Sequence, residues 1–425
     1  MPDSVLALVI LGVIIFFFVT RLIPLGLAAV LGAVAMAAFG LMSFGQAFAP
    51  FGSDIMMLLI GILTVGAALT ETGGTKIVGN AVMKIPGIGK NERLSLVVIL
   101  FVVAISTAFL FNTVVVATFL SVLAAAAKSS KGVITKKGTY MAMGFAAVVG
   151  GNMTLVSSTP QIVAQGILMQ TEGVEPMRFF TITAIALPLT LVLILYYATI
   201  GYNLQKKKFN FEEVVDEDDI AGEDEKPIDK KRAAFVGVVF LACLVCFFLE
   251  VATLGTIAVI GASLCIITKC ITIKKAVEKM DWTAVLVLGG ALGFSAGLEQ
   301  SGAMSMIVDG VFNNVGDALT PRIALAVFIF LPLVIGNFFA NTAVTILMVT
   351  LAIPIALELG VDPQVFAIAI VIGCSLTLAT PVSTPPVTMT LKGGYRFGDY
   401  TVMGGLLGVI CAIVAFILIP IIYGL

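Results

Sequence analysis

The chain has 425 residues, of which 60% are hydrophobic and 12% are charged, with a net charge of −1 and no histidine. A soluble domain is roughly a quarter charged, so a soluble protein of this composition would expose large apolar patches. The sequence therefore predicts an integral membrane protein. The lack of net positive charge and of a basic face argues against nucleic-acid binding. The six cysteines lie in or beside apolar stretches and are expected to be packing residues.

Ten apolar stretches are long enough to cross the hydrocarbon core of a bilayer, which takes about 20 helical residues. The first of them lacks the features of a cleaved signal peptide, so we expect it to be a retained membrane segment. The ten predicted spans are 4–20, 22–42, 53–74, 137–170, 179–204, 233–250, 252–269, 281–300, 364–391 and 400–424.

Two further apolar stretches, 94–127 and 320–358, are too long for one span, and an Asn-Thr pair interrupts each midway. If each enters and leaves on one side of the membrane, every Lys and Arg except Arg178 and Arg322 falls on the same side. The positive-inside rule requires such a separation. We therefore predict two re-entrant helical hairpins, both termini outside, and a cytoplasmic charged linker at 205–232.

The halves of the chain before and after the linker resemble each other. The matching motifs are FLFNT (109–113) with FFANT (338–342), and STP (158–160) with STP (383–385). Each half has the order of three spans, a hairpin, a broken span and a last span, and the two halves start on opposite sides. The sequence therefore predicts inverted repeats over 1–204 and 233–425. Such repeats serve alternating access, which favours a transporter over a channel or a membrane enzyme.

The predicted hairpin tips carry Asn112-Thr113 and Asn341-Thr342 in otherwise apolar surroundings. A re-entrant loop places backbone polar groups at membrane depth, where they are tolerated only inside protein or beside water. Asn and Thr side chains can both donate and accept hydrogen bonds. We therefore predict that these four residues bind the substrate. The alternative is that they only cap the broken helices.

The spans 137–170 and 364–391 are each interrupted by proline, the first also by a glycine pair, and both residues break helices. The N-terminus of a half-helix offers free N–H groups and partial positive charge to an anion, and unwound carbonyls suit a small cation. A plain structural kink is the alternative for either break alone. Since both halves have one, we predict that the breaks join the tips in one substrate site near the middle of the bilayer. The break residues assigned to that site are Thr159, Pro160, Thr384 and Pro385.

No charged residue lies in either tip or either break. Acidic residues inside a membrane are functional candidates, and those considered are Glu71 and Glu299 near span ends and Asp54 and Asp281 near span starts. These four could equally lie at the membrane interface. Because the predicted site has no titrating group, sodium coupling through neutral oxygens is favoured over proton coupling.

At these residues the sequence resembles the divalent anion/sodium symporter family of the ion transporter superfamily. The resemblance covers essentially the whole chain and rests on the two Asn-Thr tips and on GGNMTLVSSTPQ (150–161), ATPVSTPP (379–386) and GGYRFGDYTVMGGLLG (393–408). It implies a homodimer with a transport domain that moves like an elevator. It also implies substrates such as succinate, fumarate, malate, citrate or sulfate. The absence of histidine and of paired intramembrane acids separately argues against a membrane enzyme.

The resemblance also implies roles for individual residues. The Asn-Thr pairs would contact the substrate carboxylates. The residues of the first implied sodium site are Thr107, Asn112 and Gly151, and those of the second are Asn341, Ser383 and Thr384. The family usually has serine before each Asn-Thr pair, where this chain has Phe111 and Ala340.

The resulting prediction is sodium-coupled uptake of di- or tricarboxylates across the cell membrane by alternating access. The alternatives are carboxylate exchange, transport of sulfate or arsenite, and sodium/proton antiport.

Overall fold

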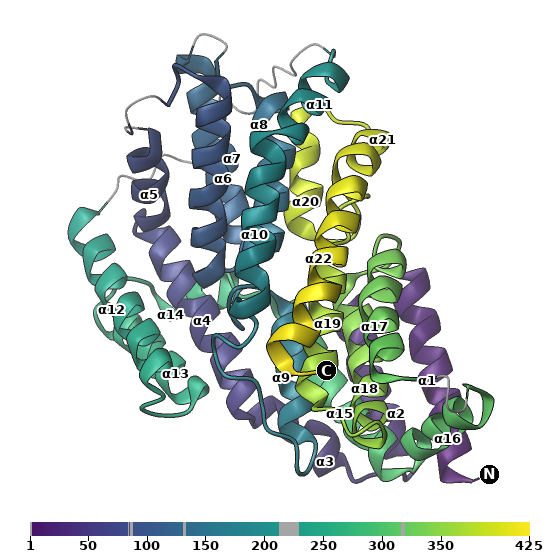
Figure 1. The fold of residues 1–425 in the computed structure, drawn as a ribbon. Helices are drawn as coiled ribbons and strands as arrows, with labels where there is room; N and C mark the ends of the chain where they lie inside the picture. Colours follow the sequence, from purple (N-terminus) through teal and green to yellow (C-terminus); the bar gives the residue numbers. More distant parts are fainter. Residues whose placement is uncertain (1, 84, 86–87, 131–132, 212–228, 316–318) are drawn as a thin grey trace.

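The computed structural model describes the whole chain except residues 1, 84, 86–87, 131–132, 212–228 and 316–318 (Figure 1). Most of the predicted linker therefore lies outside the described residues, while α11 (Ile200–Lys208) and α12 (Lys230–Leu249) extend into its two ends. All regular secondary structure in the described part of the chain is helical. The predicted all-helical membrane fold is thus confirmed.

Each of the ten predicted spans contains a helix. The unbroken ones are α1 (Asp3–Thr20), α2 (Leu25–Ala38), α4 (Asp54–Glu71), α10 (Thr183–Ala198), α12, α13 (Leu254–Ile267), α15 (Trp282–Gln300) and α22 (Leu406–Tyr423). The tenth span continues N-terminally as α21 (Phe397–Tyr400) and the π-helical turn η5 (Thr401–Gly405). By length and composition, seven continuous helices or helix runs among the described residues could cross a membrane, or eight if the bent pair α10–α11 is one span.

The two predicted hairpins and the two predicted broken spans are each a pair of helices. The hairpins are α6 (Glu92–Phe109) with α7 (Asn112–Ser129), and α17 (Pro321–Ile335) with α18 (Asn341–Glu358). The broken spans are α8 (Lys136–Gly151) with α9 (Thr159–Gln170), and α19 (Pro363–Ser375) with the short α20 (Pro385–Met389) and η4 (Thr390–Gly393). Breaks therefore occur where the sequence placed Asn-Thr pairs, Gly-Gly and Ser-Thr-Pro.

Several short helices were not predicted, because they lie in segments too short or too polar to span a bilayer. They are α3 (Phe44–Phe48), η1 (Ala49–Gly52), α5 (Gly74–Met83), α14 (Ile273–Glu278) and α16 (Ala303–Val315). In Figure 1, α5 lies just beyond the upper, C-terminal end of α4, and α16 lies near α1.

Small residues allow the long helices to pack closely in two groups. In one, α2 packs along α15 and α4 along α13. A Cβ added to Gly61 of α4 would lie 2.5 Å from the backbone of Ala258 in α13. In the other, α8 packs against α6, where a Cβ on Gly150 would lie 2.5 Å from Ala104. Close approach through Gly and Ala is the usual basis of helix association in membranes.

Five polar contacts between distant segments lie at the ends of the helices, in two sets. The set assigned by charge to the outside pairs Arg178 with Glu250 at 3.6 Å, the Asp54 carboxylate with the Gly255 N–H at 3.1 Å, and the Tyr423 hydroxyl with the Thr181 carbonyl at 2.8 Å. The set assigned to the cytoplasm pairs Lys206 with Glu92 at 3.2 Å and Lys279 with Glu71 at 3.4 Å. These contacts join only segments placed on one side by the charge distribution, so the predicted order of crossings is self-consistent. Which end faces the cytoplasm stays a prediction, as do the repeat boundaries.

Candidate substrate-binding site

One cavity of about 510 Å³ lies where the hairpin tips and the helix breaks meet. All eight residues predicted to bind substrate line it, and Ser383 does so as well. The eight are Asn112, Thr113, Thr159, Pro160, Asn341, Thr342, Thr384 and Pro385. Segments from both halves of the chain, more than 200 residues apart in sequence, therefore surround one space.

Four helices begin at this cavity. Their N-cap residues, which all line it, are Phe111 for α7, Ser158 for α9, Ala340 for α18 and Thr384 for α20. In none of these four helices does the side chain of the N-cap residue accept a hydrogen bond from the first turn. The first N–H groups of a helix have no partner within the helix, and they carry the positive end of its dipole. The N-termini of α7, α9 and α18 therefore bring positive partial charge to the uncharged tips and first break, which suits an anion, whereas α20 begins with Pro385 and Pro386, which have no N–H.

The two tip asparagines differ in their hydrogen bonds. Asn112 is the first residue of α7 and is 5% exposed, and its backbone N–H donates to the Ser157 carbonyl at 3.0 Å. Its side-chain Oδ1 has no hydrogen-bond partner among the described residues. Asn112 therefore does not cap α7, and its acceptor is free.

Asn341 is engaged by the protein. Its Nδ2 donates to the Cys374 carbonyl at 2.5 Å, and its Oδ1 accepts from the Thr377 hydroxyl at 3.1 Å. Cys374 lies in the last turn of α19, so Asn341 satisfies a carbonyl at a helix C-terminus. Asn341 thus acts in part as a helix cap, as the alternative interpretation of the tips held, whereas Asn112 does not.

Of the residues of the first implied sodium site, only Asn112 lines the cavity. A Cβ at Gly151 would collide with the Asn112 carboxamide, so Gly151 lies directly against it. The buried Thr107 hydroxyl donates to the Val103 carbonyl at 2.9 Å within α6. Neutral oxygens at an unwound helix are the ligands typical of sodium sites in transporters.

The residues of the second implied sodium site also reach the cavity. The Ser383 hydroxyl donates to the Thr377 carbonyl at 2.7 Å, whereas the buried Thr384 hydroxyl has no partner in the described part of the chain. Within the residues that the structure describes, no group of three His, Cys, Asp or Glu could hold a metal ion.

A buried network that the sequence did not indicate joins the two breaks. Asn152 and Gln161, both fully buried, are linked by an Nε2 to Oδ1 hydrogen bond of 2.7 Å. The Ser375 hydroxyl at the end of α19 donates to the same Asn152 Oδ1 at 2.8 Å. Ser375 also lines the cavity. Since a buried polar group without a partner is costly, this network fixes the two breaks relative to each other. The presence of two amide side chains inside an apolar span was the one sequence signal that could have indicated this network.

The charged part of the cavity lining comes from other helices. Arg21, the C-cap of α1, and Asp281, the N-cap of α15, are the one basic and the one acidic residue among the described lining residues. The Asp281 carboxylate accepts from the Ala284 N–H at 3.0 Å, while the Arg21 side chain is exposed. The sequence placed both residues at span ends without connecting them to the tips.

The other acidic candidates lie elsewhere. Glu71 forms ion pairs with Lys275, which lies in α14, and with Lys279, which directly follows α14. Asp54 accepts a hydrogen bond from the Gly255 N–H at the start of α13. Glu299 lies near the end of α15, and neither it nor the other two lines the cavity. These contacts indicate structural roles for Glu71 and Asp54.

Comparison with known families identifies the class of protein. The model of a family described as "Citrate transporter" matches residues 14–373. The chain belongs to this citrate transporter family. Its resemblance to the divalent anion/sodium symporters is thereby confirmed, and so is the prediction that it is a membrane transporter and not an enzyme.

Individual relatives match to different extents. An uncharacterized transporter of Haemophilus influenzae is 25% identical over 97% of this chain and 90% of its own length. The uncharacterized transporter YfbS of Escherichia coli is 30% identical, over 36% of this chain and 25% of its own length. The human Na(+)/dicarboxylate cotransporter 3 is 33% identical, over 32% of this chain and 22% of its own length. The chain thus spans only a fifth to a quarter of the latter two relatives.

The fold of this citrate transporter family member is shared with a solved transporter. The Alcanivorax borkumensis YdaH transporter aligns over 100% of this chain and 98% of its own, with a TM-score of 0.68 and 13% identity. At that identity the likeness concerns the fold alone.

Proposed function

We propose that this transporter takes up di- or tricarboxylate anions together with sodium by alternating access. The observation that carries the proposal is the convergence of four helix N-termini on one cavity of about 510 Å³. That volume lies within the usual range for small-ligand sites. Helix N-termini bind carboxylates through backbone N–H groups and the helix dipole, so the anion needs no charged residue at the tips.

Sodium coupling is supported by the chemistry around the first tip. The free Oδ1 of Asn112 and the adjacent unwound backbone at Gly151 offer neutral oxygens, which suit a small cation. Neither tip has a titrating group that could carry a proton. The name of the human relative, a Na(+)/dicarboxylate cotransporter, agrees with this assignment.

The divided lining of the cavity supports an elevator motion. The tips and breaks supply one part of the lining, and Arg21 with the start of α15 supplies another part. By the predicted orientation, Arg21 and Asp281 lie on the cytoplasmic side of the cavity, which supports an inward-facing state as part of the proposal. Movement of the tips and breaks past the α2–α15 pair would carry the substrate away from Arg21. The proposal also includes a homodimer in the cell membrane. Its two subunits would contact each other through helices other than the moving tips and breaks.

Carboxylate exchange is the second candidate function. It is favoured by Asn341, whose carboxamide is engaged by Cys374 and Thr377, so that the second tip offers less to a cation than the first.

Transport into proteoliposomes tests the proposal. Radiolabelled succinate uptake is measured with an inward sodium gradient, with choline in place of sodium, and after preloading with unlabelled succinate. Citrate, sulfate and arsenite serve as competitors. Sodium-dependent uptake supports symport, and uptake only after preloading supports exchange. Absence of succinate transport in every arm would remove the dicarboxylate assignment.

A further inference from the structure

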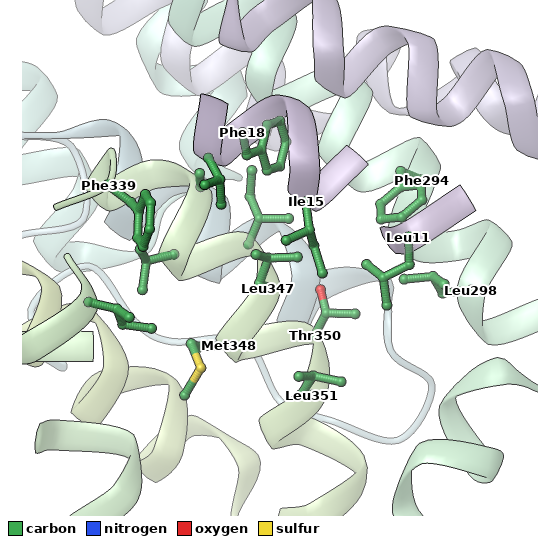
Figure 2. Close-up of a pocket in the computed structure, with 15 residues that line it drawn as sticks. Leu11, Ile15, Phe18, Phe294, Leu298, Phe339, Leu347, Met348, Thr350 and Leu351 are labelled. Carbon is green, nitrogen blue, oxygen red and sulfur yellow. The ribbon is translucent and has the colours of Figure 1, made fainter. Parts of the chain in front are cut away.

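A second cavity, of about 300 Å³, lies between α1 and the second hairpin. Its lining among the described residues is apolar except for Thr350, whose hydroxyl lies 3.4 Å from that of Ser295. Figure 2 shows Leu11 and Ile15 of α1 facing Leu347 and Thr350 of α18. The volume is at the lower end of the range for small ligands.

The surroundings of this cavity define its occupant. Val19 of α1 lines the cavity and is 43% exposed, whereas Ala343 and Val344 of α18 line it at 3% and 4% exposure. The cavity thus runs from the outer face of α1 to the buried face of α18. The neighbouring outer face of α1 is also apolar, with Val13 48% and Phe16 53% exposed. In a spanning helix such a face meets lipid tails, so hydrocarbon is the material available to enter.

The cavity also reaches the back of the substrate site. Phe339 lines the apolar cavity, while the next two residues, Ala340 and Asn341, line the substrate cavity. Consecutive residues of one hairpin tip therefore separate the two spaces. Whatever fills the apolar cavity packs against the tip from behind.

We infer that this cavity is a binding site for one acyl chain of a membrane phospholipid, which enters beside Val19 and supports the second hairpin tip. A water-filled cavity is disfavoured because a water molecule needs two or more polar partners and the lining offers one hydroxyl. An acyl chain needs no polar partner. Its presence would couple the lipid composition of the bilayer to the position of the tip. This inference does not depend on which anion or cation is transported.

Photolabelling of the full-length protein in proteoliposomes tests the inference. The probe is a phosphatidylcholine with a diazirine midway along one acyl chain, and labelled positions are mapped by peptide mass spectrometry. We expect label at Ala343 and Val344, whose side chains face away from the bulk bilayer. A phosphatidylcholine with the diazirine in its headgroup should not label these positions.

Two tryptophan substitutions on α1 provide a matched comparison. Val19→Trp at the entrance should abolish label at Ala343 and Val344. Val13→Trp, on the same helix and similarly exposed but outside the cavity lining, should leave the label unchanged. Gel filtration checks that both variants are folded. The inference is overturned if wild-type α18 is unlabelled, or if both probes label it equally. If Val19→Trp does not fold, the comparison of the two probes on the wild type decides alone.

Discussion

Asn112 and Asn341 are the first residues of the helices that leave the two hairpin tips, yet only Asn112 keeps its side-chain oxygen without a hydrogen-bond partner in the described structure. A buried acceptor without a partner costs about 1–3 kcal/mol, so its retention indicates a role in binding. Asn341 contributes instead to the junction between α18 and α19. The two tips are thus related in position and different in chemistry.

Substitution of Asn112 and Asn341 should separate these roles. We expect Asn112→Ala to abolish sodium-dependent uptake without lowering the melting temperature, because its Oδ1 makes no hydrogen bond in the described structure that could be lost. Asn341→Ala should lower both, since it removes the two hydrogen bonds of the Asn341 side chain, with the Cys374 carbonyl and the Thr377 hydroxyl, at about 1–3 kcal/mol of stability, although those two groups stay bonded to each other. Uptake and thermal unfolding in detergent are the two measurements. Near-normal uptake by Asn112→Ala would show that the free acceptor has no function.

Arg21 should act on the cytoplasmic side only. We expect Arg21→Gln to raise the KM for substrate presented from the side that Arg21 faces, roughly tenfold or less, because one exposed charge acts through a screened field. The KM from the opposite side should not change. Rising ionic strength should reduce the difference between Arg21→Gln and wild type, and Arg21→Lys should retain most of the wild-type behaviour.

Arg322→Gln is the matched control for Arg21. Arg322 is also exposed and lies in the first turn of α17, outside the cavity lining. Equal effects of the two substitutions would mean that net charge, and not the position of Arg21, governs the affinity.

The buried amide network should behave as one unit. Asn152→Ala and Gln161→Ala each remove the 2.7 Å hydrogen bond between the two side chains. In each variant, the amide that remains is buried and has lost its partner in that bond. Each should cost about 1–3 kcal/mol of unfolding free energy, and the double variant should cost clearly less than the sum. A double-mutant cycle of thermal unfolding measures the coupling. Additive effects would show that the two side chains do not depend on each other.

The aromatic residue at the first tip should limit the size of the substrate. Phe111 lines the cavity where the related family usually has serine. Phe111→Ser should therefore widen the site and add a hydroxyl, which raises the inhibition of succinate uptake by citrate relative to wild type. Ala340→Ser, the matched change at the second tip, adds a hydroxyl without removing an aromatic ring. If both variants respond equally to citrate, the hydroxyl and not the ring sets the preference.

Much of the fold could be predicted because bilayer thickness imposes a length on each span and because Pro and Gly mark the breaks. The Asn-Thr motifs and Ser-Thr-Pro motifs also indicated which segments would meet, since a repeated motif at a helix break is a local signal. The eight predicted substrate residues line one cavity for this reason.

The rest of the site depended on how the helices pack, which no local pattern encodes. Ser375 is hydrogen-bonded to Asn152, which lies 223 positions away in the sequence, and no sequence pattern around either residue indicates this contact. Arg21 lies in a short connection that the charge rule could place on one side of the membrane but not beside the tips. The difference between Asn112 and Asn341 depends on Thr377, which has no special signature in the sequence.

The measurement that tests the central claim most directly is the joint flux of ²²Na⁺ and ¹⁴C-succinate into the same proteoliposomes. The proposal predicts that each labelled species enters only when the other is present outside, and that Asn112→Ala abolishes both fluxes together. Succinate entry without accompanying ²²Na⁺, in vesicles that contain no exchangeable anion, would contradict sodium-coupled symport.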